Sequence, residues 1–213
     1  MSEVTVRHWG LQAYEPIFHA MQAHNAKPEA QRENEIWIVQ HYPVFTLGLN
    51  AKNEHVLTVE DIPLVNVDRG GQVTYHGPGQ IVIYLLLNVR ALKMGVRNVV
   101  NAMEQAMIKL LARYQITAYA RADAPGVYVD EAKIGALGLR VKQGGSYHGL
   151  SLNVDMDLRP FQQINPCGYA GMRVTQVSDL YEDCNIETLQ DELLELLLVE
   201  LNMDMSSYEN ECG

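Results

Sequence analysis

The feature that most constrains the fold is an uninterrupted run of seven apolar residues, Ile81–Leu87, within the segment IVIYLLLNV. A strand with one solvent-exposed face alternates apolar and polar residues, whereas a strand covered on both faces is apolar throughout. The run is far too short to span a bilayer as a helix. We therefore expect residues 81–89 to form a buried strand with other elements packed against both of its faces.

The remaining segments predict a mixture of strands and helices. Residues 96–114 give the clearest helix, because apolar side chains recur there at three- and four-residue steps and polar ones fill the opposite face. This mixture indicates an α+β (mixed α/β) fold, although the sequence does not fix the strand order. Further helices are predicted at 14–30 and 187–203, and further strands at 35–41, 44–49, 63–68, 72–76, 116–120, 126–130, 133–141 and 147–154.

Length, charge and cysteine content narrow the class of protein. A chain of 213 residues with 47% hydrophobic and 20% charged residues is typical of one globular domain, which we expect to span residues 1–213. The net charge of −10 argues against a general binder of nucleic acids or anionic membranes. The mixed N-terminal sequence does not read as a signal peptide, and three irregularly spaced cysteines predict neither a disulfide scaffold nor a zinc site. We expect a reduced, cytoplasmic protein that binds no metal.

The segment RGGQVTYHGPGQ (69–80) places four glycines and a proline directly before the apolar strand. It is not a phosphate-binding P-loop, because GxxxxGK is absent and a strand follows it. Two interpretations stay open on residue chemistry alone. The segment is a glycine-rich hairpin, or its backbone lies close to a ligand, with donors supplied by Arg69 and His76.

Three more segments contain residues that a packed core does not require, KIGALGLR (133–140), YHGLSLN (147–153) and NPCG (165–168). Alternation along the first predicts that Lys133 shares one face with Gly135, Leu137 and Leu139. Two interpretations of Lys133 stay open: it is a solvent-exposed surface residue, or it lies beside a ligand in the space that the two glycines leave.

Among the cysteines, Cys167 is the candidate nucleophile, because it lies between proline and glycine in a constrained turn. An inert structural thiol is the alternative. Cys184 lies among acidic residues that would raise its pKa, and Cys212 is one residue from the C-terminus.

Taken together, the four segments resemble the lipoyl(octanoyl) transferase family, in order and in spacing, from His41 to about Ser178. No motif position departs from the family pattern. The resemblance implies the mixed sheet with flanking helices of biotin and lipoate protein ligase catalytic domains. It also implies that Cys167 is the acyl-thioester nucleophile and Lys133 its catalytic partner. The residues that the family pattern assigns to the acyl-chain site are Arg69, Gly70, Gly71, Gln72, Val73, Thr74, Tyr75, His76, Ala136, Leu137, Gly138, Gly149, Leu150 and Ser151.

The activity implied by the resemblance is octanoyl transfer from octanoyl-acyl carrier protein to a specific lysine of a lipoyl domain. Expected acceptors are the lipoyl domains of 2-oxoacid dehydrogenases and the glycine cleavage H protein. The acyl donor is carried on the phosphopantetheine of the carrier, so neither ATP nor another cofactor is expected. An ammonium beside a cysteine favours the thiolate, and exchange of one thioester for another keeps the acyl group activated.

Two matters stay open at this point. An acidic carrier protein needs a basic patch on this acidic chain, for which Arg140 and Lys142, or Arg90, Lys93 and Arg97, are candidates. Other functions also remain: an ATP-dependent lipoate or biotin ligase of the same fold, or a non-catalytic module that binds an acyl carrier or lipoyl domain. The pairing of Cys167 with Lys133 argues against both alternatives.

Overall fold

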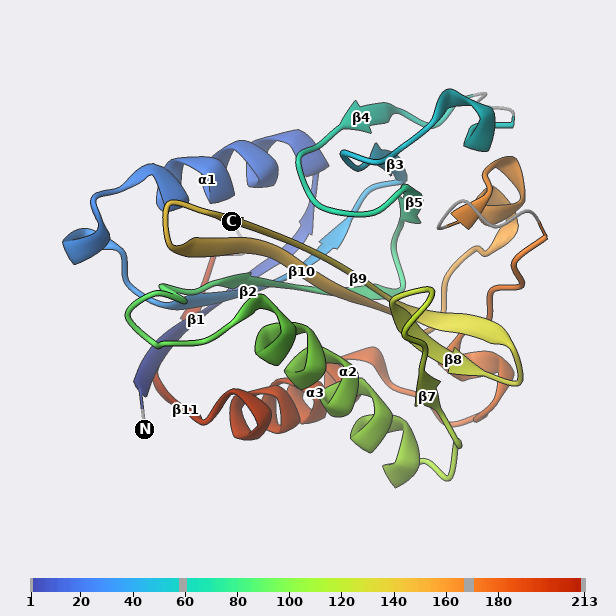
Figure 1. The fold of residues 1–213 in the computed structure, drawn as a ribbon. Coiled ribbons are helices and arrows are strands. Elements are labelled where there is room, and N and C mark those ends of the chain that lie inside the picture. Colours follow the sequence, from blue (N-terminus) through green and yellow to red (C-terminus); the bar gives the residue numbers. More distant parts are fainter. Residues whose placement is uncertain (1, 58–60, 167–170, 212–213) are drawn as a thin grey trace.

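The computed structural model describes residues 2–57, 61–166 and 171–211. Its centre is an eight-stranded mixed sheet in the order β11-β1-β2-β6-β10-β9-β8-β7 (Figure 1). Strand β1 runs parallel to both β11 and β2, and the other neighbours in this sheet are antiparallel. The strands are β1 (Ser2–Gln12), β2 (Glu35–His41), β6 (Gln80–Leu86), β7 (Tyr119–Ala120), β8 (Gly126–Val129), β9 (Ala132–Lys142), β10 (Gly145–Asn153) and β11 (Met203–Asn210).

Helices and a second, small sheet cover the two faces of the large sheet. Helices α2 and α3 lie on one face, and α1 lies on the other with the three-stranded sheet β4-β3-β5 (Figure 1). No helix of the described residues is long and apolar enough to cross a membrane. The elements are α1 (Tyr14–Ala26), α2 (Val96–Arg113), α3 (Ile186–Leu201), β3 (Val44–Leu47), β4 (Leu64–Asn66) and β5 (Val73–His76), with short 3₁₀ turns at Glu29–Gln31, Asn53–His55, Arg159–Gln163 and Val177–Asp179.

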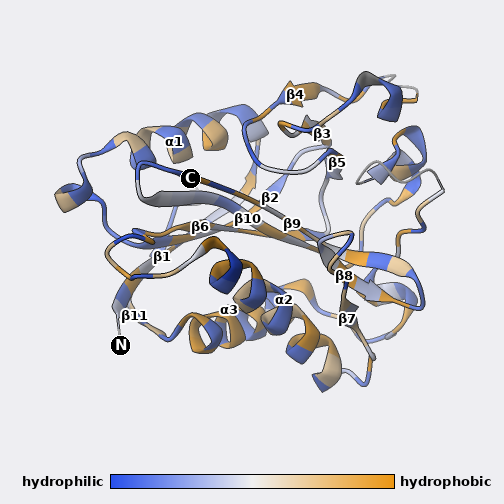
Figure 2. Ribbon diagram, viewed as in Figure 1, coloured by the Kyte–Doolittle hydropathy of each residue, from blue (hydrophilic) through white to orange (hydrophobic). Residues whose placement is uncertain are grey.

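Strand β6 is the centre of the hydrophobic core, and every one of its residues is buried. Its odd-numbered residues, from Ile81 to Leu85, pack into the core beneath α2 and α3. Its even-numbered residues, from Val82 to Leu86, pack with α1 on the other face. The expectation of a strand covered on both faces is therefore confirmed. Helices α2 and α3 show the complementary pattern, with hydrophobic and hydrophilic residues alternating along each (Figure 2).

The helix ends follow from local chemistry. The side chain of Asn185 caps α3 by accepting a hydrogen bond from the Thr188 backbone N–H at 2.8 Å. The same helix ends at Asn202, which adopts the left-handed conformation at φ 53°. Helix α1 ends at Ala26, earlier than predicted, because Pro28 disfavours helical geometry in the residue before it.

Strands β1 and β11 were not predicted from the sequence. Strand β11 lies at the edge of the sheet, where most of its residues are exposed, so it carries little apolar alternation. Strand β1 buries only Val4 and Val6 fully and is polar over much of its length. Their parallel pairing joins the two ends of the described chain, with Val4 opposite Met205.

A β-bulge in β9 corrects the predicted orientation of Lys133. Gly135 pairs with Val127, but Lys133 pairs with Tyr128, so one extra residue, Ile134, is accommodated in β9. Beyond the bulge, side chains such as Leu137 pack toward α2, and a Cβ on Gly135 would come within 2.7 Å of the Met107 sulfur. The prediction that Lys133 shares a face with Gly135, Leu137 and Leu139 is therefore wrong. The bulge turns the lysine to the opposite face of the sheet.

Candidate active site

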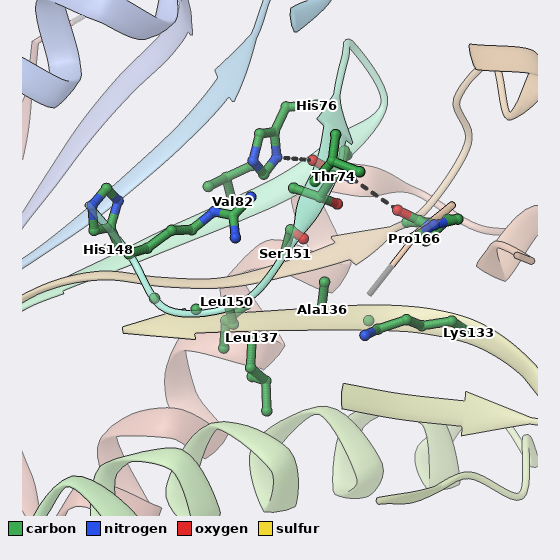
Figure 3. A pocket seen from close by; sticks show the side chains of 18 of the residues that line it. Thr74, His76, Val82, Lys133, Ala136, Leu137, His148, Leu150, Ser151 and Pro166 are labelled. Carbon is green, nitrogen blue, oxygen red and sulfur yellow. Dashed lines mark hydrogen bonds between the residues drawn. The ribbon is translucent and has the colours of Figure 1, made fainter. Parts of the chain in front are cut away.

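A pocket that holds about 750 Å³ of space, open solvent at its mouth included, lies over the face of the large sheet toward which Lys133 points. Strands β6, β9 and β10 form its floor, and β5 with the loop before it forms a wall (Figure 3). Thirteen residues predicted for the site line it: Arg69, Gly71, Gln72, Val73, Thr74, His76, Lys133, Ala136, Leu137, Gly138, Gly149, Leu150 and Ser151.

Of the other three predicted residues, Gly70 and Tyr75 lie elsewhere and Cys167 is not described. Gly70 does not line the pocket, and its N–H donates to the carbonyl oxygen of Leu139 at 3.3 Å, which ties the loop to β9. Tyr75 also points away, because alternation along β5 turns it into a cluster where its ring lies 5.4 Å from that of Phe161. Cys167 lies outside the described residues. The residue before it, Pro166, lines the pocket.

The pocket floor is built mainly by small side chains. Ala136 and Ser151 face the pocket, whereas Leu137 points toward α2 (Figure 3). Leu150 belongs to the core on the α2 side, so it contributes to the pocket through its backbone. Larger apolar surface comes from Val82 on β6, whose side chain packs with the α1 cluster and lines the pocket.

Lys133 is held at one end of this floor and is only 5% exposed. Its Nζ donates to the carbonyl oxygen of Pro125 at 2.9 Å and lies 5.5 Å from the ring centroid of Tyr128. Both contacts suit an ammonium group, since a carbonyl oxygen and a ring face are negatively polarised. Lys133 and Pro166 lie at the same end of the pocket, and His148 lies at the opposite end (Figure 3).

Arg69 joins the loop of residues 69–72, called the glycine loop below, to the small sheet. Its guanidinium donates to the carbonyl and hydroxyl oxygens of Thr46, each at 2.9 Å, and to the carbonyl of Gly70 at 2.9 Å. Its stem crosses β9, where a Cβ on Gly138 would lie 2.8 Å from the Arg69 Cδ. The arginine is therefore a buried positive charge that also fixes the loop over the floor.

A carboxylate anchors the far end of the pocket. Asp68 accepts hydrogen bonds from the Tyr147 hydroxyl and, at 3.0 Å, from Nε2 of His148. Burial opposes ionisation of Asp68, but these bonds outweigh it and lower its pKa to about 2. Burial lowers the pKa of His148, so the ring is neutral, with Nδ1 unprotonated. His148 also has φ 62°, a strained conformation of the kind that concentrates at functional sites.

A second polar chain crosses the pocket under α1. His41 Nδ1 lies 3.1 Å from the carbonyl oxygen of Gln12 and must donate to it, so His41 Nε2 accepts from the Tyr84 hydroxyl at 2.8 Å. Tyr84 shares a hydrogen bond with Tyr14. Burial raises the pKa of Tyr14 to about 12 and lowers the pKa of His41 to about 4. The three side chains of this hydrogen-bonded row, His41, Tyr84 and Tyr14, are therefore neutral near pH 7.

Comparison of the chain with known proteins identifies its family. The lipoyl protein ligase A/B catalytic domain matches residues 13–198. The chain belongs to this family. It is also 55% identical over 199 residues to an octanoyltransferase of Shewanella pealeana, an alignment that covers 93% of this chain and 91% of the relative. The resemblance to octanoyltransferases predicted from the four motifs is thus confirmed, and these relatives are acyltransferases.

Solved structures confirm the predicted fold class. A bipartite lipoate protein ligase of Thermoplasma acidophilum superposes with a TM-score of 0.71 at 14% identity, covering 99% of this chain and 88% of the ligase. A biotin protein ligase of Aquifex aeolicus gives a TM-score of 0.55 at 10% identity, covering 95% and 70%. The chain therefore has the α+β fold of lipoate and biotin ligase catalytic domains.

Several residues in this pocket or next to it were missed at the sequence level. Gln80 and Asn153 end two of the quoted motifs and line the pocket, so the motifs themselves contained the signal. Asp68 directly precedes the glycine loop. The only sign of its role in the sequence was its position, as an acid between a short predicted strand and that loop. No signal in the sequence pointed to Tyr14 or Tyr84, because Tyr14 lies in a predicted helix and Tyr84 in the predicted core strand. Within the described residues, no group of three or more His, Cys, Asp and Glu side chains could hold a metal ion.

The glycines of the family motifs have two different roles. A Cβ on Gly149 would lie 2.1 Å from the carbonyl oxygen of Ile83, so this glycine allows β10 to approach β6. A Cβ on Gly77 would lie 2.4 Å from the Tyr75 hydroxyl. Gly71, by contrast, lines the pocket at φ 88°, a conformation that disfavours other residues. A backbone that lies close to a ligand is therefore one role of these glycines, as at Gly71, whereas Gly149 and Gly77 also accommodate the protein's own atoms.

Proposed function

We propose that this protein transfers an octanoyl group from octanoyl-acyl carrier protein to a lysine of a lipoyl domain, through a thioester on Cys167. The observation that carries the proposal is a buried lysine, Lys133, at the same end of the pocket as Pro166, the residue directly before the proposed nucleophile. The octanoyltransferase relatives support the nature of the acyl group. The acceptor proteins that we propose are the lipoyl domains of 2-oxoacid dehydrogenases and the glycine cleavage H protein.

In the first step, the Cys167 thiolate attacks the carbonyl carbon of the carrier-bound thioester. A new C–S bond forms, the bond to the phosphopantetheine sulfur breaks, and the Lys133 ammonium gives its proton to that departing sulfur. One thioester replaces another, so no ATP or other cofactor is needed in the proposed reaction. An ammonium next to the cysteine favours its thiolate, and each pKa unit is equivalent to about 1.4 kcal/mol.

In the second step, the acceptor lysine attacks the enzyme thioester as a neutral amine. The N–C bond forms, the C–S bond breaks to restore the Cys167 thiolate, and the amine gives one proton to the now neutral Lys133. The starting state of both residues is regenerated. Lys133 thus acts as acid in one step and as base in the next.

A basic surface suited to an acidic carrier lies along β9. Arg140 and Lys142 continue this strand beyond the pocket residue Gly138. The Arg90 backbone N–H donates to the carbonyl of Gly144 in the hairpin that joins β9 to β10, at 3.1 Å. Arg90, from the second group of basic residues considered from the sequence, therefore lies beside this hairpin, where its side chain also contacts Glu29 at 3.2 Å. We propose that the carrier docks there and extends its phosphopantetheine along β9.

The test is to mix the protein with octanoyl-carrier protein, without ATP, and to measure its intact mass. The proposal predicts a single octanoyl adduct that Cys167→Ala abolishes and that Cys184→Ala and Cys212→Ala retain. An adduct that persists in Cys167→Ala would contradict the thioester. If no adduct forms, addition of free octanoate, ATP and an acceptor domain distinguishes an ATP-dependent ligase, which then acylates the acceptor, from a non-catalytic binding module.

A further inference from the structure

Two buried amides in the pocket have no role in the reaction described so far. Gln80 at the start of β6 and Asn153 at the end of β10 are directly paired across the sheet. They are 1% and 4% exposed, and both line the pocket. A buried amide is costly unless its oxygen and nitrogen are hydrogen-bonded, so the contacts of this pair are informative.

The direction of each hydrogen bond follows from a backbone carbonyl at one end. The Thr175 carbonyl can only accept, so the atom of Asn153 that lies 3.0 Å from it is the donor Nδ2. Asn153 Oδ1 must then accept from Gln80 Nε2, at 2.9 Å. The same Gln80 nitrogen lies 3.3 Å from a second carbonyl, that of Tyr75, which independently fixes the amide orientation. Gln80 Oε1 is therefore the atom that faces His76.

This network fixes the tautomer of His76. Gln80 Oε1 lies 2.7 Å from Nδ1 of His76, and an oxygen without a proton requires Nδ1 to carry the hydrogen. Nε2 then presents a lone pair, and no hydrogen bond joins it to another described residue. Burial lowers the pKa of His76 to about 3, with the nearby His41 acting in the same direction, so the ring is neutral near pH 7.

An unpaired acceptor on a pocket wall calls for a hydrogen-bond donor in the ligand. An octanoyl chain and its thioester carbonyl carry no N–H or O–H group. The phosphopantetheine arm has amide N–H groups but departs with the carrier in the first step, whereas the neutral lysine amine of the second step carries two N–H groups. His76 faces the pocket from the β5 wall, and Lys133 faces it from the floor strand β9 (Figure 3). A single amine between them could direct one N–H toward each.

We propose that His76 Nε2 accepts a hydrogen bond from the acceptor lysine amine and orients its lone pair toward the thioester, with Gln80 and Asn153 as positioning residues that fix the His76 tautomer. The inference rests on the proposed function. In the second step, the proton released by the amine passes to Lys133, and the N–H that remains in the amide product is the one held by His76. His76 itself never takes up a proton, as its low pKa requires.

The same network is anchored to the backbone of Lys133. The Thr175 backbone N–H donates to the carbonyl of Lys133 at 3.0 Å, and the Lys133 N–H donates to the carbonyl of Arg173 at 2.8 Å. One hydrogen-bonded path therefore leads from Lys133 through Thr175, Asn153 and Gln80 to His76. It sets the separation of the two groups that are proposed to hold the amine.

The kinetic test compares His76→Asn with His76→Gln in single-turnover measurements of both steps. Asparagine places its amide near the Nδ1 position and keeps only the bond to Gln80, whereas glutamine can place an acceptor oxygen near the Nε2 position. We expect His76→Asn to slow lysine acylation by a factor on the order of 10 to 100 beyond its effect on acyl-enzyme formation. His76→Gln should recover part of that loss.

Equal losses in both steps, or no difference between the two variants, would overturn the role of His76. A wild-type protein that forms no octanoyl adduct would instead overturn the proposed function. A second measurement is independent of activity: ¹⁵N NMR of the wild-type protein should show His76 as the neutral tautomer protonated on Nδ1. A proton on Nε2 would overturn the inference.

The pH dependence gives a further readout that a purely structural role would not change. In Gln80→Glu, a carboxylate still accepts from His76 Nδ1, and its negative charge raises the pKa of the ring. His41, Arg69 and His148 also face His76 and oppose its protonation, so they limit the size of this rise. We expect the lysine step of this variant to fall at low pH with an inflection absent from wild type. Superimposable normalised profiles would count against the proposal.

Discussion

Asp68 Oδ1 lies 3.0 Å from His148 Nε2, and this bond joins the residue before the glycine loop to the middle of β10. The Tyr147 hydroxyl donates to the same carboxylate. His148 is held at φ 62° with its ring 5.4 Å from that of Phe18, so the carboxylate bond and the α1 packing both maintain a strained residue. Asp68 therefore anchors the start of the loop to β10, in addition to the contacts that Arg69 and Gly70 make.

Replacing Asp68 with asparagine should destabilise the protein at neutral pH. Hydrogen bonds to charged groups contribute about 1.5–3 kcal/mol each, so we expect a loss of that order in the free energy of unfolding of Asp68→Asn. Because the pKa of Asp68 is lowered from 3.8 to about 2, its stabilisation is present above pH 4 and is lost as the pH falls toward 2. Urea unfolding at pH 7 and at pH 3 measures this difference.

Asp191 supplies the matched control, because it is exposed on α3. Asp191→Asn should change the free energy of unfolding by less than about 0.5 kcal/mol at either pH. If Asp68→Asn is as stable as this control at pH 7, the carboxylate does not anchor the loop.

Buried neutral histidines should make the protein less stable in mild acid. Burial lowers the pKa of His41 to about 4 and that of His76 to about 3, whereas both titrate near 6.5 when unfolded. Below pH 6.5 the unfolded chain therefore binds protons that the folded protein excludes. From pH 7 to pH 5 the free energy of unfolding should fall by about 2 kcal/mol for each of the two residues.

Equilibrium unfolding across this range, in wild type and in His41→Gln, tests the effect. The variant should lose about 2 kcal/mol less than wild type between pH 7 and pH 5. His19→Gln is the control, since His19 is exposed on α1 and should leave the dependence unchanged. A stability that stays constant from pH 7 to pH 5 would show that these rings are protonated when folded.

The role of Lys133 as an acid and a base predicts that arginine cannot replace it. Lys133→Ala should abolish most octanoyl transfer, and Lys133→Arg should not restore turnover, because arginine keeps the charge but does not exchange a proton near neutrality. The assay follows acyl-enzyme formation and transfer to a lipoyl domain separately. Full turnover by Lys133→Arg would mean that only the positive charge matters.

Gly126 offers a way to move Lys133 without replacing it. A Cβ at this position would lie 2.5 Å from the Lys133 Cε, 2.7 Å from the carbonyl oxygen of Gly135 and 2.8 Å from the Lys133 Nζ, and φ is 146°. Gly126→Ala should therefore displace the ammonium and reduce octanoyl transfer by a factor on the order of 100, since a shift of about 1 Å can have that effect. Circular dichroism and thermal unfolding of the variant would check that it still folds, because the backbone contact and the φ value are themselves strained. Gly95→Ala, before α2 and with no contact closer than 3.4 Å, should retain activity. Equal activities would show that the position of Lys133 is not critical.

The sequence predicted the parts of this structure that depend on local pattern. The run at 81–87 identified the central strand because burial on both faces requires apolar residues throughout. The orientation of Lys133 could not be predicted, because the bulge at Ile134 is visible only in the pairing of β9 with β8. Asp68 and His148 are 80 residues apart, and only the packed sheet brings them into contact.

The last prediction concerns the length of the acyl chain. Val82 projects into the pocket from β6 (Figure 3), so its size should affect how much chain fits. Each buried methylene contributes about 0.8 kcal/mol, so hexanoyl should be about 15-fold poorer than octanoyl in kcat/KM. A longer chain should be poorer for another reason, because overfilling a packed site costs about 1–3 kcal/mol.

Changing Val82 should move this optimum in both directions. Val82→Phe fills part of the pocket and should favour hexanoyl over octanoyl, whereas Val82→Ala should improve decanoyl relative to octanoyl. The measurement is kcat/KM for hexanoyl, octanoyl, decanoyl and dodecanoyl carrier-protein thioesters with wild type and both variants. A profile that is the same in all three proteins would show that the chain does not pass Val82. A flat wild-type profile would mean that recognition of the carrier, and not the pocket, selects the acyl group.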